Sequence, residues 1–250
     1  MRPYEALALV YDEWTAENDY QGWSEYIIKA AGTSAGGNLL DLCCGTGRMT
    51  RLLHDAGYQV TGVDSSPGML YRAAEALPPG TPLIEKDLAV AGGELGVPSG
   101  AFDVVVCSFD SMNYFSAESS LSALFTYAAT ALRPGGTFVF DVNTRTKLQD
   151  VFGDSHYGDD LGSFGYVWRN RYEPSSRTCR FLITLYLREG TLFTRSEEVH
   201  VQRWYETGEL TSLAAGAGFT IRAVTDDYTD SPAGPDTLRE TWVLKRGDGV

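Results

Sequence analysis

The sequence predicts an α/β fold built on a doubly wound, mostly parallel sheet. Apolar runs of strand length alternate with segments of helical periodicity, and this alternation requires crossover connections between parallel strands. A glycine turn follows the first run directly, as in nucleotide-binding α/β folds. The chain has 250 residues, 43% of them hydrophobic, which suits one core and a single domain, residues 1–250. The expected strands are 39–42, 59–63, 82–85, 102–108 and 137–142, and the expected helices are 49–55, 68–76 and 119–132.

Helices are also expected before the first strand, within residues 1–36. Apolar and aromatic residues recur at helical spacing in two stretches, 7–14 and 23–30, and a polar break at 17–19 separates them. Aromatic residues at such spacing are usually core residues. The pattern therefore predicts two helices that pack against the sheet.

A different pattern begins after the fifth strand. Residues 144–206 contain three stretches rich in β-branched and aromatic residues, 164–172, 178–188 and 192–205, separated by turn-forming residues. They predict an inserted antiparallel meander. A short helix at 208–217 and two strands at 219–225 and 238–245 complete the expected order. A closing turn at 132–136, which contains Pro and two Gly, is expected between the helix 119–132 and its following strand.

Composition limits the classes of partner. The net charge of −13 and the pI of about 4.6 disfavour nucleic acid and anionic membranes, which bind through Lys and Arg. The four cysteines form no C-x-x-C pair, and the His and Cys spacings indicate no metal site. Free thiols and the lack of a signal peptide or a membrane-length apolar run predict a cytoplasmic protein. Homodimer formation is left open.

The turn after the first strand predicts a nucleoside site. Residues 39–47 read Leu-Leu-Asp-Leu-Cys-Cys-Gly-Thr-Gly, an apolar strand that ends in a bare backbone turn. The second strand stops at Asp64, 17 residues beyond Gly47, near the distance at which a carboxylate meets a ribose diol. A dinucleotide fingerprint would have a third glycine where Thr50 stands. Asp41 would also repel a phosphate and attract an ammonium group, so S-adenosylmethionine fits better than a dinucleotide.

With these motifs the chain resembles the class I, seven-strand, S-adenosylmethionine-dependent methyltransferases over most of its length. The resemblance implies a sheet whose last strand is antiparallel and an N-terminal lid, residues 1–36, that folds over the cofactor. Cys43 stands where the family often has Gly. The cofactor contacts that the resemblance implies are Tyr11, Asp41, Cys44, Gly45, Thr46, Gly47, Asp64, Ser65, Met69, Asp87, Leu88 and Phe109.

Two stretches are expected near the transferred methyl group. Residues 109–114 follow the fourth strand, and the resemblance places Asp110 near the methionine part and Asn113 and Tyr114 towards the acceptor. The alternative is that Asp110 or Ser111 only caps the next helix. Because residues 109–114 should line the junction of cofactor and acceptor, Asp110 is a catalytic candidate.

The second stretch is residues 198–205, where Glu198, His200 and Gln202 share one face of a strand. His200 is a candidate base or hydrogen-bonding anchor, with Glu198 or Gln202 setting its tautomer, although a lone strand histidine is more often structural. The order His-x-Gln-Arg-x-Tyr resembles a subgroup of small methyltransferases. It makes Arg203 and Glu198 candidate acceptor contacts, and the aromatic content of the meander adds Trp168.

The predicted function is methyl transfer to a small, apolar or aromatic, natural-product-like acceptor by in-line displacement. The meander would set specificity, because loops on a shared fold usually carry substrate choice. The acceptor atom, N, C or O, is not resolved. A non-catalytic S-adenosylmethionine-binding sensor or interaction module is the alternative, and a nicotinamide-dependent dehydrogenase is a weaker one.

Overall fold

The computed structural model describes residues 3–32, 36–90 and 94–247. The predicted lid 1–36 and single domain 1–250 also include residues 1–2, 33–35, 91–93 and 248–250, which lie outside the described residues. Among the helices of the described ranges, none is both long and apolar enough to cross a membrane.

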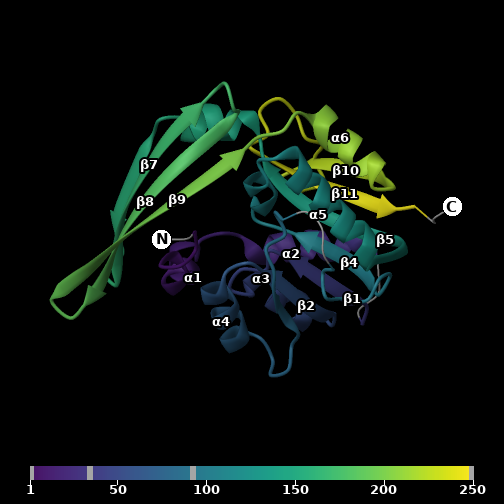
Figure 1. Cartoon of the computed structure of the whole chain (residues 1–250), viewed down its shortest axis with the longest axis horizontal. Helices are drawn as coiled ribbons and strands as arrows, with labels where there is room; N and C mark the ends of the chain where they lie inside the picture. The colour runs from purple at the N-terminus through teal and green to yellow at the C-terminus, as the bar shows by residue number, and fades with distance from the viewer. Residues whose placement is uncertain (1–2, 33–35, 91–93, 248–250) are drawn as a thin grey trace.

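A seven-stranded sheet forms the centre of the molecule, in the order β10-β11-β5-β4-β1-β2-β3 (Figure 1). Strands β1 to β5 pair in parallel, whereas β11 is antiparallel to both of its neighbours. The predicted fold class, including the antiparallel last strand, is confirmed. The strands are β1 Asn38–Leu42, β2 Gln59–Asp64, β3 Leu83–Glu85, β4 Phe102–Cys107, β5 Leu132–Asn143, β10 Phe219–Asp226 and β11 Arg239–Arg246.

Helices cover both faces of this sheet because its strands are apolar on both faces. On β1, Leu40 and Leu42 face a core that includes residues of α5 and α6, while Leu39 faces a second core with α2 and α3. The helices are α1 Tyr11–Trp14, α2 Tyr20–Ala31, α3 Arg48–Asp55, α4 Pro67–Ala76, α5 Glu118–Ala131 and α6 Thr207–Gly216, with short turns of helix η1 Leu7–Leu9, η2 Ser111–Tyr114 and η3 Thr146–Phe152.

The predicted turn at 132–136 lies inside β5 instead of before it. Leu132 already pairs with Phe102, and the next pair joins Thr137 to Val104, so β5 carries extra residues at this point. Gly135 has a φ of 72°, which lets the backbone bend there. The Pro-Gly-Gly sequence therefore makes an irregularity within the strand.

A separate four-stranded antiparallel sheet, β6-β7-β8-β9, rises from the end of β5 as a long curved arm (Figure 1). It consists of β6 His156–Asp160, β7 Phe164–Glu173, β8 Thr178–Glu189 and β9 Leu192–Arg203. The expected meander is present with one strand more than predicted. The residues of β6 are all exposed, so their sequence lacks the apolar alternation that marks a strand.

The N-terminal strap, residues 3–9, crosses between the arm and the central sheet. Ala6 and Leu7 are buried in a third core with Phe164, Phe181 and other residues of the arm. The break predicted at 17–19 separates α1 from α2, and a further 3₁₀ turn, η1, precedes α1. Figure 1 shows α1 beside the arm, so the start of the chain meets the inserted strands next to the central sheet.

Asn113 is expected to be a stability residue. It is fully buried, its Nδ2 donates to the carbonyls of Asn143 (3.1 Å) and Arg203 (2.9 Å), and its Oδ1 accepts from Asn143 N (2.8 Å). Asn113→Ala leaves buried backbone groups without partners and should lower the unfolding free energy by about 2–4 kcal/mol in urea titrations. Asn38→Ala, at an exposed strand end, is the control, and an equal loss in both variants would contradict this role.

Candidate functional site

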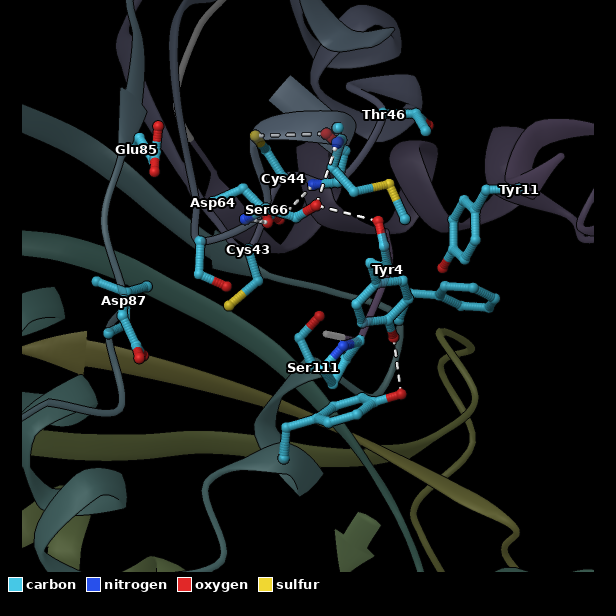
Figure 2. A pocket seen from close by; sticks show the side chains of 18 of the residues that line it. Tyr4, Tyr11, Cys43, Cys44, Thr46, Asp64, Ser66, Glu85, Asp87 and Ser111 are labelled. Atoms are coloured by element: carbon cyan, nitrogen blue, oxygen red, sulfur yellow. Dashed lines mark hydrogen bonds between the residues drawn. The ribbon is translucent and has the colours of Figure 1, made fainter. Parts of the chain in front are cut away.

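A cavity of about 940 Å³ opens at the carboxyl ends of β1 to β4, where ligands bind in open parallel sheets. The N-terminal strap and Tyr11 close one side, and the end of β3 forms the opposite side (Figure 2). Ten of the twelve predicted cofactor residues line it: Tyr11, Cys44, Gly45, Thr46, Asp64, Ser65, Met69, Asp87, Leu88 and Phe109.

The glycine turn leaves bare backbone against this cavity. Gly45 has a φ of 55°, and a Cβ placed there would meet no atom within 4 Å, so its backbone borders open space. Gly47 has a φ of 79°, and a Cβ there would lie 3.1–3.2 Å from Ala73 of α4. Gly47 is thus required for the packing of α3 against α4, while Gly45 permits close approach of a ligand.

Asp41 lies below the turn, outside the lining of the cavity. Its carboxylate is 1% exposed; Oδ2 accepts from Thr50 Oγ1 at 2.5 Å, and Oδ1 has no partner among the described residues. Burial raises the pKa of Asp41 to about 7, against the lowering effect of the Thr50 bond. An unpartnered buried carboxylate oxygen is a favourable place for a cationic group.

Asp64 presents its carboxylate at the end of β2. Oδ2 accepts from Gly45 N and Oδ1 from Ser66 N, each at 2.8 Å, which fixes the carboxylate against the glycine turn. Burial raises the pKa of Asp64, although these backbone bonds lower it. Ser66 caps α4 by accepting from Met69 N (3.3 Å), and its hydroxyl donates to the carbonyl of Tyr4 (3.1 Å), so the β2 turn also holds the strap.

Asp87 follows β3 on the far side of the cavity from Tyr4 and Tyr11 (Figure 2), and Leu88, the next residue, also lines the cavity. The Asp87 carboxylate accepts from Ala89 N at 2.9 Å, which orders the loop. Two acidic positions, Asp64 and Asp87, therefore stand along one wall. Two carboxylates at the ends of the neighbouring strands β2 and β3 suit the hydroxyls and the amine of a nucleoside.

The turn after β4 adopts an uncommon backbone. Phe109 and Asp110 have φ values of 61° and 50°, and left-handed conformations in non-glycine residues store strain that clusters at functional sites. Asp110 N donates to Asp141 Oδ2 (2.8 Å), and its carboxylate accepts from Gln202 Nε2. Asp110 makes no side-chain cap to η2, so the capping alternative is not what the structure shows. Phe109 lines the cavity, but Asp110 does not.

Arg239 is a part of this turn that sequence reasoning missed. From the start of β11 its guanidinium lies 3.2 Å from Asp141 Oδ2 and 3.6 Å from Asp110 Oδ1, and it covers the rings of Trp23 and Phe109. Burial, with a smaller contribution from the nearby Asp110 carboxylate, raises the pKa of Asp141 to about 6, against the lowering effect of Arg239. No local signal marks this arginine, because its partners come from distant segments.

His200 lies behind the cavity wall and does not line it. It is 2% exposed; Nδ1 is 3.1 Å from Tyr114 Oη, and Nε2 is 3.1 Å from Glu198 Oε2. Tyr114, which does line the cavity, stands between the imidazole and the ligand space. Glu198 accepts from three backbone N–H groups of the strap, those of Tyr4 (2.7 Å), Ala6 (2.6 Å) and Leu7 (2.9 Å).

The other acceptor candidates also lie outside the lining of the cavity. Asn113 joins η2 to β5 and β9, as described above. Trp168 packs against Trp14 and Phe181 in the third core. Arg203 pairs with Glu209 of α6 at 2.5 Å. Of the predicted acceptor contacts, the structure brings only Tyr114 to the cavity.

Comparison with known proteins identifies the family. A model of a methyltransferase domain matches residues 39–136, and a protein of Bacillus subtilis named Putative methyltransferase YqeM is 30% identical over 230 residues, 91% of each chain. The chain belongs to the class I S-adenosylmethionine-dependent methyltransferases. This confirms the predicted enzyme class and cofactor and disfavours the dehydrogenase alternative.

Solved structures share the whole architecture. A S-adenosylmethionine-dependent methyltransferase from Clostridium acetobutylicum has a TM-score of 0.83 and 28% identity over 98% of this chain and 99% of that one. The sugar N-methyltransferase KedS8 of Streptoalloteichus shows the same fold, with a TM-score of 0.75 and 22% identity over 95% and 92% of the two chains. The matched lengths include the inserted arm as well as the central sheet.

The residues at the cavity fit S-adenosylmethionine. Asp64 and Asp87 offer acceptors to a nucleoside, and the bare turn at Gly45 allows close approach. Beneath that turn, outside the lining, the unpartnered Oδ1 of Asp41 favours an ammonium group close to the turn. When bound, the cofactor supplies an activated methyl group on a sulfonium. The neighbouring side chains need only orient it and exclude water.

The raised pKa of Asp41 gives a prediction for the ligand-free protein. A carboxyl with a raised folded pKa keeps its proton in the fold when the unfolded chain has lost it, so its contribution to stability is lost as pH rises through about 7. Asp41→Asn does not titrate. The stability of this variant relative to the parent should therefore grow by about 1–3 kcal/mol between about pH 4.5 and about pH 7.5 in urea titrations. If the unfolding free energy of Asp41→Asn minus that of the parent stayed constant or fell over this pH range, the raised pKa of Asp41 would be refuted.

Proposed function

We propose that this methyltransferase acts on a small molecule bound at the tyrosine-lined end of the cavity. The proposal rests on the observation that a single cavity contains both kinds of wall. Its acidic wall is formed by Asp64 and Asp87, and its aromatic end by the rings of Tyr4, Tyr11 and Tyr114. Its volume of about 940 Å³ is at the upper end of small-molecule sites, with room for a cofactor and a small acceptor together. The net charge of −13 disfavours nucleic acid as the acceptor.

We assign the cofactor contacts along this cavity. Asp64 takes the ribose hydroxyls, and Asp87 and the Leu88 N–H take the adenine. Asp41, which lies beneath the turn and outside the cavity lining, attracts the methionine ammonium through its unpartnered oxygen. Thr46, Cys44, Ser65 and Met69 line the space between these groups. Tyr11 and Phe109, whose ring centroids lie 6.1 Å apart, border the methyl group.

Transfer itself is an in-line displacement, so the protein must place a nucleophile opposite the methyl group and keep water out. The strap supplies the cover, because Ser66 and Glu198 hold it from both sides of the cavity. Asp110 acts as a positioning residue: its bonds to Asp141, Arg239 and Gln202 fix the left-handed turn that carries Phe109.

The acceptor is apolar or aromatic where it meets the rings, and the inserted arm with the strap sets its shape. Trp168, Asn113 and Arg203 influence it indirectly, by holding the elements that frame the cavity. KedS8, which shares the fold, is named a sugar N-methyltransferase. Nitrogen is therefore the first acceptor atom to test. A cytoplasmic location and homodimer formation stay predictions from the sequence.

A screen tests the proposal directly. The protein is incubated with S-adenosylmethionine and a panel of an amine (tyramine), an amino sugar (glucosamine), a phenol (catechol) and an indole (tryptophol), and mass spectrometry detects methylated product and S-adenosylhomocysteine. Methylation of at least one probe is expected. Absence of any product with a correctly folded, cofactor-binding protein would contradict small-molecule transfer in this cavity.

Asp64→Asn tests the cofactor assignment. Loss of the negative charge weakens the two hydrogen bonds proposed from the ribose hydroxyls to Asp64. The Kd for S-adenosylmethionine should therefore rise by about tenfold or more in calorimetric titrations. Asp230→Asn is the control, because the Asp230 side chain is 75% exposed and pairs only with Lys29 on the surface in the described structure. Equal affinities of the two variants would refute the role of Asp64.

A further inference from the structure

Four polar side chains form a continuous line from the cavity to the interior. Tyr4 and Tyr114 line the cavity, and Tyr4 Oη donates to Tyr114 Oη at 2.7 Å. Tyr114 Oη lies 3.1 Å from His200 Nδ1, and His200 Nε2 lies 3.1 Å from Glu198 Oε2. His200 and Glu198 are 2% and 1% exposed, so the line ends in a buried carboxylate. Figure 2 shows the Tyr4 end of the line, with the hydrogen bond from its hydroxyl drawn.

The direction of every hydrogen bond in this line follows from Glu198. Burial favours its neutral form, but bonds from His200 and from strap N–H groups outweigh burial and hold the pKa of Glu198 below its usual value. An ionised carboxylate only accepts, so Nε2 of His200 carries the hydrogen and Nδ1 accepts from Tyr114. Tyr114 in turn accepts from Tyr4. All the hydrogens therefore point away from the cavity.

The cavity face of this line can only accept hydrogen bonds. Because both phenolic hydrogens are engaged inside the line, Tyr4 presents an oxygen lone pair and its ring to a ligand. The oxygen of Tyr114 is already bonded by Tyr4 and Gln202, so Tyr114 offers its ring. Burial raises the pKa of both phenols, which stay neutral. The ring of Tyr11 lies 5.9 Å from that of Tyr4. Lone pairs together with aromatic rings attract a cationic N–H donor.

We propose that Tyr4, Tyr114, His200 and Glu198 form a proton relay that deprotonates an amine acceptor; this inference rests on the proposed function. The ammonium gives one proton to Tyr4 Oη, Tyr4 passes its own to Tyr114, and Tyr114 passes its own to His200 Nδ1. The imidazolium remains beside the Glu198 carboxylate. The freed nitrogen lone pair forms a bond to the methyl carbon as the carbon–sulfur bond breaks, and the electron pair of that bond goes to sulfur.

The surroundings of His200 are compatible with this role. The titratable groups that face it are Glu198 on its own strand, Tyr4 on the strap and Tyr114 on η2. The residue paired with it on β8 is Phe181, which is apolar. Asp110 acts on Tyr114 from the β4 turn, as a negative charge that favours a proton on the phenol. An imidazolium is therefore balanced by a buried carboxylate within hydrogen-bonding distance.

The strap makes the relay conditional on closure. Glu198 binds the backbone N–H groups of Tyr4, Ala6 and Leu7, so one carboxylate both holds the cover and terminates the relay. Tyr4, the first member, is itself part of the cover. Deprotonation of the acceptor is therefore possible only when the cofactor is shielded from water.

Activity against pH tests the relay on the first amine of the panel that the parent methylates. His200→Gln and Tyr114→Phe should lower kcat by about 10²-fold or more near pH 7, because the acceptor stays protonated. The deficit should shrink as pH approaches the pKa of the amine, while the Kd for S-adenosylmethionine stays within about twofold of the parent. His156→Gln, at an exposed position of β6, should behave as the parent does.

Three results would overturn the relay: an unchanged pH profile in His200→Gln, a pH-independent loss that accompanies loss of cofactor binding, or methylation of the phenol alone. A second measurement needs no acceptor. In ¹⁵N-histidine NMR of the resting protein, the His200 signal, assigned by its loss in His200→Gln, should report hydrogen on Nε2. Hydrogen on Nδ1 would refute the relay even if the proposed function held. Failure of the whole panel with Nε2–H present would refute the proposed function, and with it amine deprotonation, while the order of hydrogen bonds from Tyr4 to Glu198 would stand.

Discussion

The buried guanidinium of Arg239 is the interaction on which the geometry of the site depends. It lies at the start of β11 and reaches Asp141 at the end of β5, Asp110 in the β4 turn and Asp227 after β10. A buried charge is tolerated only when it is paired, and three carboxylates within 3.2–3.6 Å pair this one. The guanidinium also covers the rings of Trp23 and Phe109, so the N-terminal helix α2 is tied to the same point.

This pairing explains how a strained turn persists. Phe109 and Asp110 both adopt left-handed backbone, which costs free energy for non-glycine residues. The bond from Asp110 N to Asp141 and the contact of Arg239 with Phe109 determine that conformation from outside the turn. The strain places the Phe109 ring in the cavity and turns the Asp110 carboxylate away from it.

Glu198 holds the strap that covers the cavity, as Arg239 holds the turn after β4. Arg239 fixes the sheet side of the site, whereas Glu198 fixes the strap that covers it. Both are buried charges whose partners lie on segments far apart in sequence. The cavity therefore lies between one wall built on the central sheet and one covered by the strap that the arm holds.

The prediction from sequence succeeded where the signal is local. Alternating apolar runs located the strands of the central sheet, and the glycine turn with Asp64 and Asp87 located the acidic wall. It failed where the signal is not local. Strand β6 has no buried side chain to produce a pattern, and the Pro-Gly-Gly of β5 has turn composition within a paired strand.

The sequence by itself determined the fold and the methyl donor, because strand periodicity and the spacing from Asp41 to Asp87 are properties of neighbouring residues. Only the tertiary structure decided what His200 and Asp110 can touch. His200 is separated from the cavity by Tyr114, and Asp110 is drawn towards Arg239, because their environments are assembled from segments up to 194 residues apart. The tyrosine rings that line the cavity beside the strap follow from packing between the strap, the arm and η2, which no local pattern encodes.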